Sequence, residues 1–213
     1  MRFINRREAG WRLAARLIEY AGRQDVIVLA LARGGVPVAY EIAKAIGAPL
    51  DVFLVRKLGV PGYEELAMGA IATGGVSVLN EDVVRYLDIS VETVEEVTER
   101  ERRELERRER LYRGERARPD LAGRAIILVD DGLATRATMR AAPRLVREHR
   151  PARIIIAVPV ALRATYDAYN DLADGVVFVS GSAPDPFYAM GLWYDDFSQT
   201  TDEEARELLA QAA

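Results

Sequence analysis

The chain has 213 residues and half of them are hydrophobic, which is enough to bury a core as one domain with a small appendage. The net charge of −4 argues against nucleic-acid binding, because that function usually needs a strongly basic face. The absence of cysteine excludes disulfides and thiol catalysis, and no stretch approaches the roughly 20 apolar residues of a membrane span. The first residues lack the apolar centre of a secretory signal, so we expect a cytoplasmic enzyme that acts on small molecules.

Helical stripes and short apolar runs alternate along the chain. Helical periodicity is found over residues 7–21, 36–46, 138–147 and 202–212. Continuous apolar runs, which indicate buried strands, lie at 26–31, 51–55, 125–130, 153–158 and 175–179. The alternation predicts an α/β fold with a mostly parallel, twisted sheet that is flanked by helices.

Two segments and one residue stand apart from this alternation. Residues 58–68 contain a Pro-Gly pair and predict a loop. Residues 70–73 and 76–79 predict two strands of a hairpin that turns at a pair of glycines. The single histidine, His149, ends a predicted helix, where a positive charge suits the helix terminus better than it suits catalysis.

Residues 91–113 are dominated by Glu and Arg at i,i+4 spacing, with a thin apolar stripe at Val94, Val97, Leu105 and Leu111. This pattern predicts a long solvated helix that projects from the core or pairs across a dimer. A nucleic-acid-binding arm is the alternative, but the charges of the segment are mixed rather than basic.

The most informative segment covers residues 126–138, with the sequence IILVDDGLATRAT. Its apolar residues are continuous, which predicts a strand buried on both faces. Asp130 and Asp131 therefore follow the carboxyl end of a strand, where open α/β sheets place their ligand crevice. A helix is predicted from Thr138, so the preceding loop offers backbone N–H groups to a phosphate. The pattern predicts a sugar-phosphate site in which the carboxylates accept from ribose hydroxyls and Thr135 and Thr138 hold the phosphate.

The same pattern has a plainer alternative, since an acidic pair also caps the helix of an ordinary strand–turn–helix unit. Arg33, Gly34 and Gly35 follow the first predicted strand in the same context. Glycine amides there form a small anion nest or only a tight turn. No third spaced glycine follows, so this segment is not a dinucleotide fingerprint.

Residues 129–138 resemble the phosphoribosyl-pyrophosphate (PRPP) motif of the type I phosphoribosyltransferases, and the resemblance extends over most of residues 25–200. It implies the fold of that family, with a Rossmann-like core. It also implies a transferase that moves the phosphoribosyl group of PRPP to a nitrogenous base and releases pyrophosphate. Mg²⁺ is the implied cofactor, nucleotide salvage the implied role, and a homodimer the implied assembly.

The resemblance also implies roles for individual residues. Asp130 and Asp131 match the acids that bind the ribose and the metal, and Asp195 matches a further acid near the metal. Lys57 matches a basic residue that meets the pyrophosphate, and Glu65 either assists a leaving group or is an ordinary solvated glutamate. The implied substrate-binding residues are Arg33, Gly34, Gly35, Arg56, Gly132, Leu133, Ala134, Thr135, Arg136, Ala137, Thr138 and Tyr188.

Two further segments resemble parts of the family's active site. Residues 59–66 are similar to the mobile loop that closes over the site and excludes water. The aromatic-rich segment 180–200 is similar to the hood in which an aromatic, here Tyr188, stacks on the base. From composition alone, this segment equally predicts a small core beneath a loop.

The chain departs from the family pattern at two places. Arg136 stands where the family usually has glycine, and its guanidinium either contacts the phosphate or crowds the pocket. The strand at 154–160 lacks the lysine with which purine-salvage members read the purine. Both departures favour an alternative function, a catalytically weak PRPP- or nucleotide-binding regulatory protein. A sugar-phosphate enzyme unrelated to base transfer is a third hypothesis.

We therefore expect one phosphoribosyltransferase-like domain over residues 1–213. Within it we expect a charged helical insertion at 88–115 and a hood segment at 180–200. The expected partners are PRPP and a nitrogenous base, with no nucleic acid and no membrane.

Overall fold

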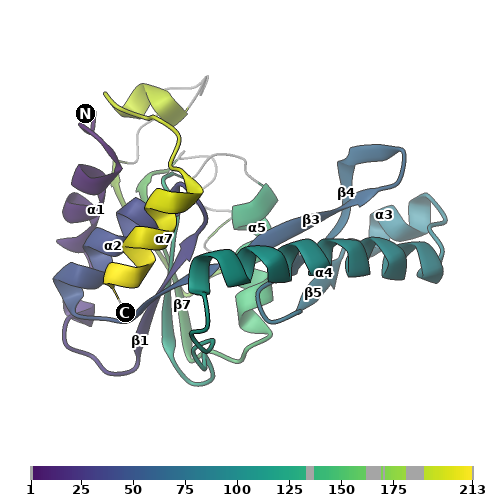
Figure 1. The fold of residues 1–213 in the computed structure, drawn as a ribbon, viewed down its shortest axis with the longest axis horizontal. Helices are drawn as coiled ribbons and strands as arrows, with labels where there is room; N and C mark the ends of the chain where they lie inside the picture. Colours follow the sequence, from purple (N-terminus) through teal and green to yellow (C-terminus); the bar gives the residue numbers. More distant parts are fainter. Residues whose placement is uncertain (1, 133–136, 162–168, 170, 181–189, 213) are drawn as a thin grey trace.

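The computed structural model describes residues 2–132, 137–161, 169, 171–180 and 190–212. Its centre is a five-stranded sheet with the order β2-β1-β6-β7-β8, in which every neighbouring pair is parallel (Figure 1). The strands are β1 (Val26–Leu31), β2 (Leu50–Phe53), β6 (Ala125–Val129), β7 (Arg153–Val160) and β8 (Gly175–Ser180). The predicted α/β fold with a mostly parallel sheet is confirmed.

Helices cover both faces of this sheet, which is why its central strands are apolar throughout. Every residue of β1 and β6 is buried. Alternate residues of β1 enter different clusters: Val28 packs with the helices at 6–14 and 35–46, and Leu29 packs with the helix at 137–147. The helices are α1 (Arg6–Ala14), α2 (Gly35–Ile46), α3 (Glu81–Tyr86), α4 (Val91–Arg113), α5 (Ala137–Arg147) and α7 (Asp202–Gln211), with short 3-10 turns at Ile18–Tyr20 and Met190–Trp193. No helix in the described ranges is long and apolar enough to cross a membrane.

A second sheet lies beside α5 and has the order β3-β4-β5. Its strands are β3 (Val55–Val60), β4 (Tyr63–Ala72) and β5 (Ser77–Leu79), all antiparallel. The predicted hairpin at the glycine pair is confirmed by the pairing of β4 with β5. The prediction of a loop over 58–68 is wrong, because this segment is itself a hairpin that turns at Pro61-Gly62. Irregular pairing around Gly59 interrupts the alternation by which a strand is recognised in sequence.

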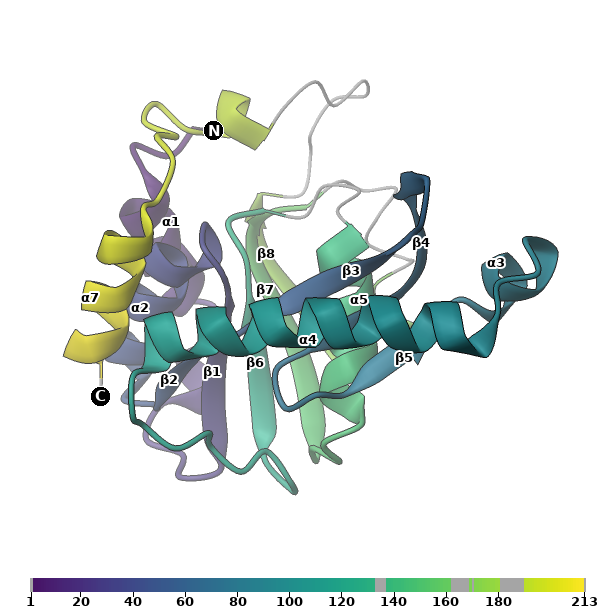
Figure 2. The same ribbon diagram turned by 45° about the vertical axis from the view of Figure 1, so that its right-hand side comes forward.

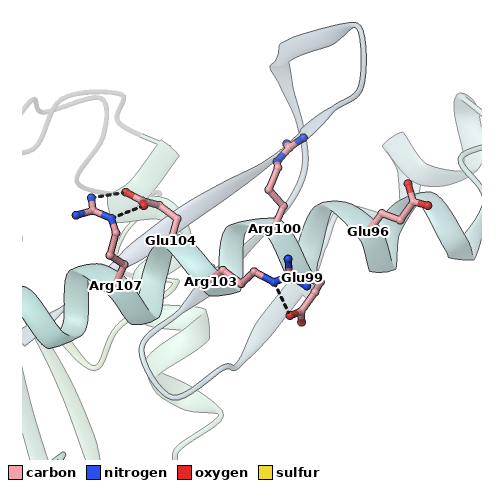
Figure 3. A pocket seen from close by; sticks show the side chains of 6 residues that line it. All are labelled: Glu96, Glu99, Arg100, Arg103, Glu104 and Arg107. Atoms are coloured by element: carbon pink, nitrogen blue, oxygen red, sulfur yellow. Dashed lines mark hydrogen bonds and ion pairs between the residues drawn. The ribbon is translucent and has the colours of Figure 1, made fainter.

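The predicted long charged helix is confirmed as α4, which runs alongside the second sheet from α3 toward α7 (Figure 2). Its apolar contacts include Val97, Leu105 and Tyr112, which are buried in the main core. The helix is therefore not a free projection. Its outward face carries the mixed charges seen in Figure 3, where Arg107 is paired with Glu104, and Arg103 with Glu99.

Buried charges attach α4 to the central sheet. Arg113, at the last turn of α4, donates from Nη2 to Oδ2 of Asp51 on β2 at 2.9 Å, and both side chains are almost completely buried. Glu109, also buried, lies 3.8 Å from Arg113 and accepts from Arg118. The interior makes such a pair costly to break, because the remaining charge is left without a counter-ion.

We predict that Arg113→Met lowers the free energy of unfolding by about 3–5 kcal/mol, because it leaves Asp51 charged and buried. Arg103→Met is the control, since it removes an exposed pair on the same helix and is expected to cost under about 1 kcal/mol. Chemical denaturation measures both. The double variant Asp51→Leu/Arg113→Met is expected to recover part of the loss. Equal losses for the two single variants would contradict this account of α4.

Candidate functional site

The site begins at the reversal of strand order in the central sheet. From β1 the chain continues to β2 on one side, and β6 is followed by β7 on the other, so β1 and β6 flank the switch point. Ligands of open α/β sheets bind outside the carboxyl ends of the strands at such a point. The two segments found there are 32–35 after β1 and 130–132 after β6, which are the segments singled out in the sequence.

These two segments touch so closely that only glycine fits the first. A Cβ added to Gly34 would stand 2.2 Å from Oδ2 of Asp131. A Cβ added to Gly35 would stand 2.6 Å from the carbonyl oxygen of Val129. The peptide bond between Ala32 and Arg33, one residue earlier, is cis. The glycine loop therefore packs its backbone directly on the acidic loop.

Both carboxylates of the acidic pair are buried. Oδ1 of Asp130 accepts a hydrogen bond from the backbone N–H of Asp131 at 2.9 Å. Oδ2 of Asp131 accepts two hydrogen bonds from Arg6, from Nε at 3.0 Å and from Nη2 at 2.9 Å. Because two hydrogen bonds from one guanidinium constrain a carboxylate strongly, Arg6 fixes the orientation of the Asp131 side chain.

Arg6 is a site residue that the sequence did not reveal. It is the first residue of α1, and its side chain reaches Asp131 in the acidic loop, 125 positions later in the sequence. Its Nη1 also donates to the carbonyl oxygen of Ser198 at 2.6 Å, and its guanidinium lies 3.9 Å from the ring centre of Phe197. In the sequence, Arg6 is one arginine in a run of charged residues, and no local pattern distinguishes it from Arg7.

The described part of the C-terminal segment braces the acidic loop. The Tyr194 hydroxyl donates to the carbonyl oxygen of Asp131 at 2.6 Å. Met190 covers Gly132, where an added Cβ would stand 2.1 Å from its sulfur. Both side chains share a small core with Phe3, whose backbone pairs with this segment. The small-core alternative of the sequence therefore holds for this part of the segment.

Asp195 lies in the same segment but faces solvent. Its side chain is 59% exposed and pairs with Arg2 at 3.4 Å. The predicted role of Asp195 near a metal stays a prediction.

The two basic residues at the start of β3 point to opposite faces of the strand. Arg56 pairs with Glu101 of α4 at 2.7 Å. Lys57 lines a cavity on the other face and lies 3.6 Å from Glu65 of β4. The reason is that successive side chains of a strand point to opposite faces of the sheet. Lys57 and Glu65, both predicted to act in catalysis, are thus neighbours, whereas Arg56 contacts the supporting helix.

Arg33 also has an acidic neighbour, because its Nη1 lies 3.6 Å from Oδ1 of Asp202, the first residue of α7. Asp202 accepts a hydrogen bond from the Tyr112 hydroxyl as well. Burial, followed by this hydrogen bond, raises the pKa of Tyr112 above its usual range. The sequence predicted the last helix but no part for it in the site, and this contact places its first residue beside the glycine loop.

Several predicted residues fall outside the described part of the chain. These are Leu133, Ala134, Thr135, Arg136 and Tyr188, and the same holds for the side chain of Ala137. Thr138, which stands in the first turn of α5, is described and exposed.

One cavity of about 610 Å³ lies between the second sheet and α5, and its lining includes Lys57 and Thr138 but no residue of the acidic loop. A hollow of about 540 Å³ over α4 is different in kind (Figure 3). All its lining residues belong to the outer face of that helix, and most of their charges are paired with each other. We therefore take the two loops in contact at the ends of β1 and β6 as the candidate site.

The fold and this pair of loops are typical of a phosphoribosyltransferase-like protein, and comparison with known families agrees. Residues 5–182 match the family model of the phosphoribosyl transferase domain, so the chain belongs to that family. The membership predicted from the PRPP-like motif is confirmed.

Individual relatives give the same result. The protein named Putative phosphoribosyl transferase Rv0571c, from Mycobacterium tuberculosis, is 44% identical over 99% of this chain. The alignment covers 47% of that protein, so this chain spans about half the length of the curated relatives it matches. The crystal structure of TT1426 from Thermus thermophilus is 41% identical, covers both chains completely and superposes with a TM-score of 0.86. AQ2163 from Aquifex aeolicus shares the fold at 12% identity, with a TM-score of 0.52 over 96% of this chain and 84% of that one.

We predict that Gly34→Ala lowers the free energy of unfolding by about 1–3 kcal/mol, because the new methyl group must displace the Asp131 carboxylate from Arg6. Gly175→Ala is the matched control: no atom lies within 4 Å of its added Cβ, so it is expected to be neutral or slightly stabilising. Denaturant titration compares the two. A Gly34 variant as stable as the control would show that the glycine contact is not restrictive.

Proposed function

We propose that this chain binds PRPP and transfers its phosphoribosyl group to a nitrogenous base, with release of pyrophosphate. The observation that carries the proposal is the pair of buried carboxylates packed on a glycine loop at the switch point of the sheet. Carboxylates suit the vicinal hydroxyls of ribose, because each can accept a hydrogen bond from an O–H group. The N-terminal end of α5, next to them, suits the 5′-phosphate.

In this proposal the acidic pair orients the sugar and the glycine loop receives the leaving group. Asp131, held by Arg6, presents a charged oxygen to the ribose. Backbone amides of Gly34 and Gly35 face the pyrophosphate. Displacement at the anomeric carbon passes through an oxocarbenium-like state, so catalysis depends on positioning and on stabilising the departing charge. No protein nucleophile is required.

Lys57 and Arg33 supply positive charge for the departing pyrophosphate. Each has an acidic neighbour at 3.6 Å, Glu65 and Asp202 respectively, in a pair that is partly or fully exposed. Exposed pairs of this kind contribute only about 0–1 kcal/mol. A pyrophosphate group carries more charge than one carboxylate, so it can replace Glu65 and Asp202 at little cost.

The donor set fits a magnesium ion that arrives with the substrate. No group of three or more His, Cys, Asp or Glu side chains that could hold a metal occurs among the described residues. Mg²⁺ characteristically uses one or two carboxylates and completes its shell with substrate phosphates and water. Asp130 and Asp131 would contribute the carboxylates, and the ion would neutralise charge on the pyrophosphate.

A regulatory PRPP- or nucleotide-binding protein is the second candidate, and one sequence observation favours it. Arg136 stands in the phosphate loop where the family usually has glycine. Cytoplasmic location, a role in nucleotide salvage and a homodimer remain predictions from the sequence.

Calorimetry with PRPP and Mg²⁺ tests the binding step. We predict that Asp131→Asn weakens binding at least about 100-fold, from the loss of a buried charged acceptor. Asp171→Asn, an exposed site, is the control and is expected to bind like the native protein. The native protein is then incubated with PRPP and each of a panel of purines and pyrimidines, and pyrophosphate is measured.

Each outcome favours or contradicts one of the proposed functions. Binding with pyrophosphate release for one base supports the transferase. Tight binding with no release for any base favours the regulatory protein. An absence of PRPP binding, or equal binding by Asp131→Asn, contradicts both.

A further inference from the structure

The outer side of the first helix carries an exposed apolar stripe. α1 lies at the edge of the molecule, and its inner side packs on α2 (Figure 1). Ile4, Trp11 and Ile18 have 61%, 58% and 65% of their surface exposed. Large apolar side chains that gather on a surface are typical of a region that a partner covers. No function was assigned to this side of the helix from the sequence.

The three residues of the stripe follow one another at intervals of seven positions. Seven residues are close to two turns of an α-helix, so side chains at this spacing lie along one line of its surface. Single turns carry the helical path beyond α1 to the 3-10 turn at Ile18–Tyr20. Leu13 and Leu17, which fall on the other side of this path, are completely buried. The spacing and the burial therefore agree on one exposed line.

Trp11, in the middle of the stripe, is held in a fixed orientation. Its indole Nε1–H donates to Oε2 of Glu41 on α2, and Arg7 donates from Nε to Oε1 of the same carboxylate at 2.6 Å. Glu41 is buried, so the polar atom of the indole is bonded inward while much of the ring stays exposed. A tryptophan that is already ordered loses little conformational freedom when a partner binds, and tryptophan is enriched among the residues that dominate interfaces.

The stripe has the same order in both directions, with one isoleucine seven residues before Trp11 and another seven residues after it. Two copies of such a helix can pair antiparallel about a two-fold axis that passes between their tryptophans. Each Ile4 then lies against Ile18 of the partner subunit, and the two Trp11 side chains lie against each other. A two-fold interface requires such self-complementarity, because both copies use the same patch.

The residues beside the stripe fit the same arrangement. Glu8 precedes Trp11 by three positions and Arg16 follows it by five, so antiparallel pairing brings these opposite charges near each other. Ala15 is small and exposed, which allows a second helix to approach closely. The outward side of α4 is less suited to a second copy, because Glu99 and Glu104 already pair with arginines of their own helix.

We propose that the stripe of Ile4, Trp11 and Ile18 is the interface with a second copy of this chain, in which the two α1 helices pair antiparallel about a two-fold axis. The inference is independent of the proposed function, since it concerns the outer side of the helix. Arg6, the first residue of the same helix, reaches Asp131 from the inner side. The second copy therefore packs on the helix that orients the Asp131 side chain.

The test is the oligomeric state, measured by sedimentation equilibrium over a concentration series. We expect the native chain to form a dimer with a dissociation constant at or below about 10 µM. The variant Ile4→Glu/Ile18→Glu places like charges opposite each other and is expected to weaken dimerisation at least about 100-fold. The variant Ile4→Glu/Ile18→Lys places opposite charges at the same contacts and is expected to recover at least about tenfold of that loss.

The matched control is Tyr86→Glu/Val91→Glu, which changes two exposed apolar residues of α3 and α4 on the opposite side of the molecule (Figure 1). It is expected to dimerise like the native chain, and circular dichroism checks that every variant is folded.

Three results would overturn the proposal. The first is a native chain that stays monomeric at about 100 µM, which leaves the stripe to a different protein or to a further domain such as the longer relatives have room for. The second is a dimer that survives in Ile4→Glu/Ile18→Glu or is lost in the control, because the interface then lies elsewhere. The third is equal weakening by the Glu/Glu and Glu/Lys variants, which excludes the antiparallel pairing.

Discussion

The contact between two loops at the centre of the sheet is the constraint on which the rest of the site depends. Gly34 lies so close to Oδ2 of Asp131 that a methyl group has no room, and Arg6 donates two hydrogen bonds to the same oxygen. The carboxylate is therefore in contact with both the glycine backbone and a guanidinium. A buried carboxylate needs such partners, because an uncompensated charge in the interior is strongly destabilising.

Some elements around this contact hold the acidic loop and the sheets in place, and others line the neighbouring cavity. The N-terminal segment around Phe3 and the segment around Tyr194 meet beside the acidic loop, where Tyr194 donates to the Asp131 carbonyl oxygen and Met190 covers Gly132. Side chains of β3 alternate between its two faces, so that Arg56 contacts α4 and Lys57 lines the cavity. The long charged helix thus serves the site indirectly, since its buried charges hold the second sheet and β2 in place.

Sequence reasoning predicted the strands of the central sheet well, because strands buried on both faces are continuous apolar runs. It also located the acidic pair and the glycine loop, since both follow such runs directly. It missed the hairpin at 55–72, whose pairing is irregular at Gly59 and whose tip is exposed. It missed Arg6 and Asp202 for another reason: their contacts join residues more than 100 positions apart, and no local pattern marks them.

The account is tested most directly by whether Arg6 acts through Asp131. The measurement is a double-mutant cycle of PRPP affinity with Arg6→Met, Asp131→Asn and their combination, with Arg16→Met as an exposed control. The account predicts that Arg6→Met weakens PRPP binding at least about tenfold, and that it adds little to the loss already caused by Asp131→Asn. Native-like binding by Arg6→Met, or losses that simply add, would contradict it.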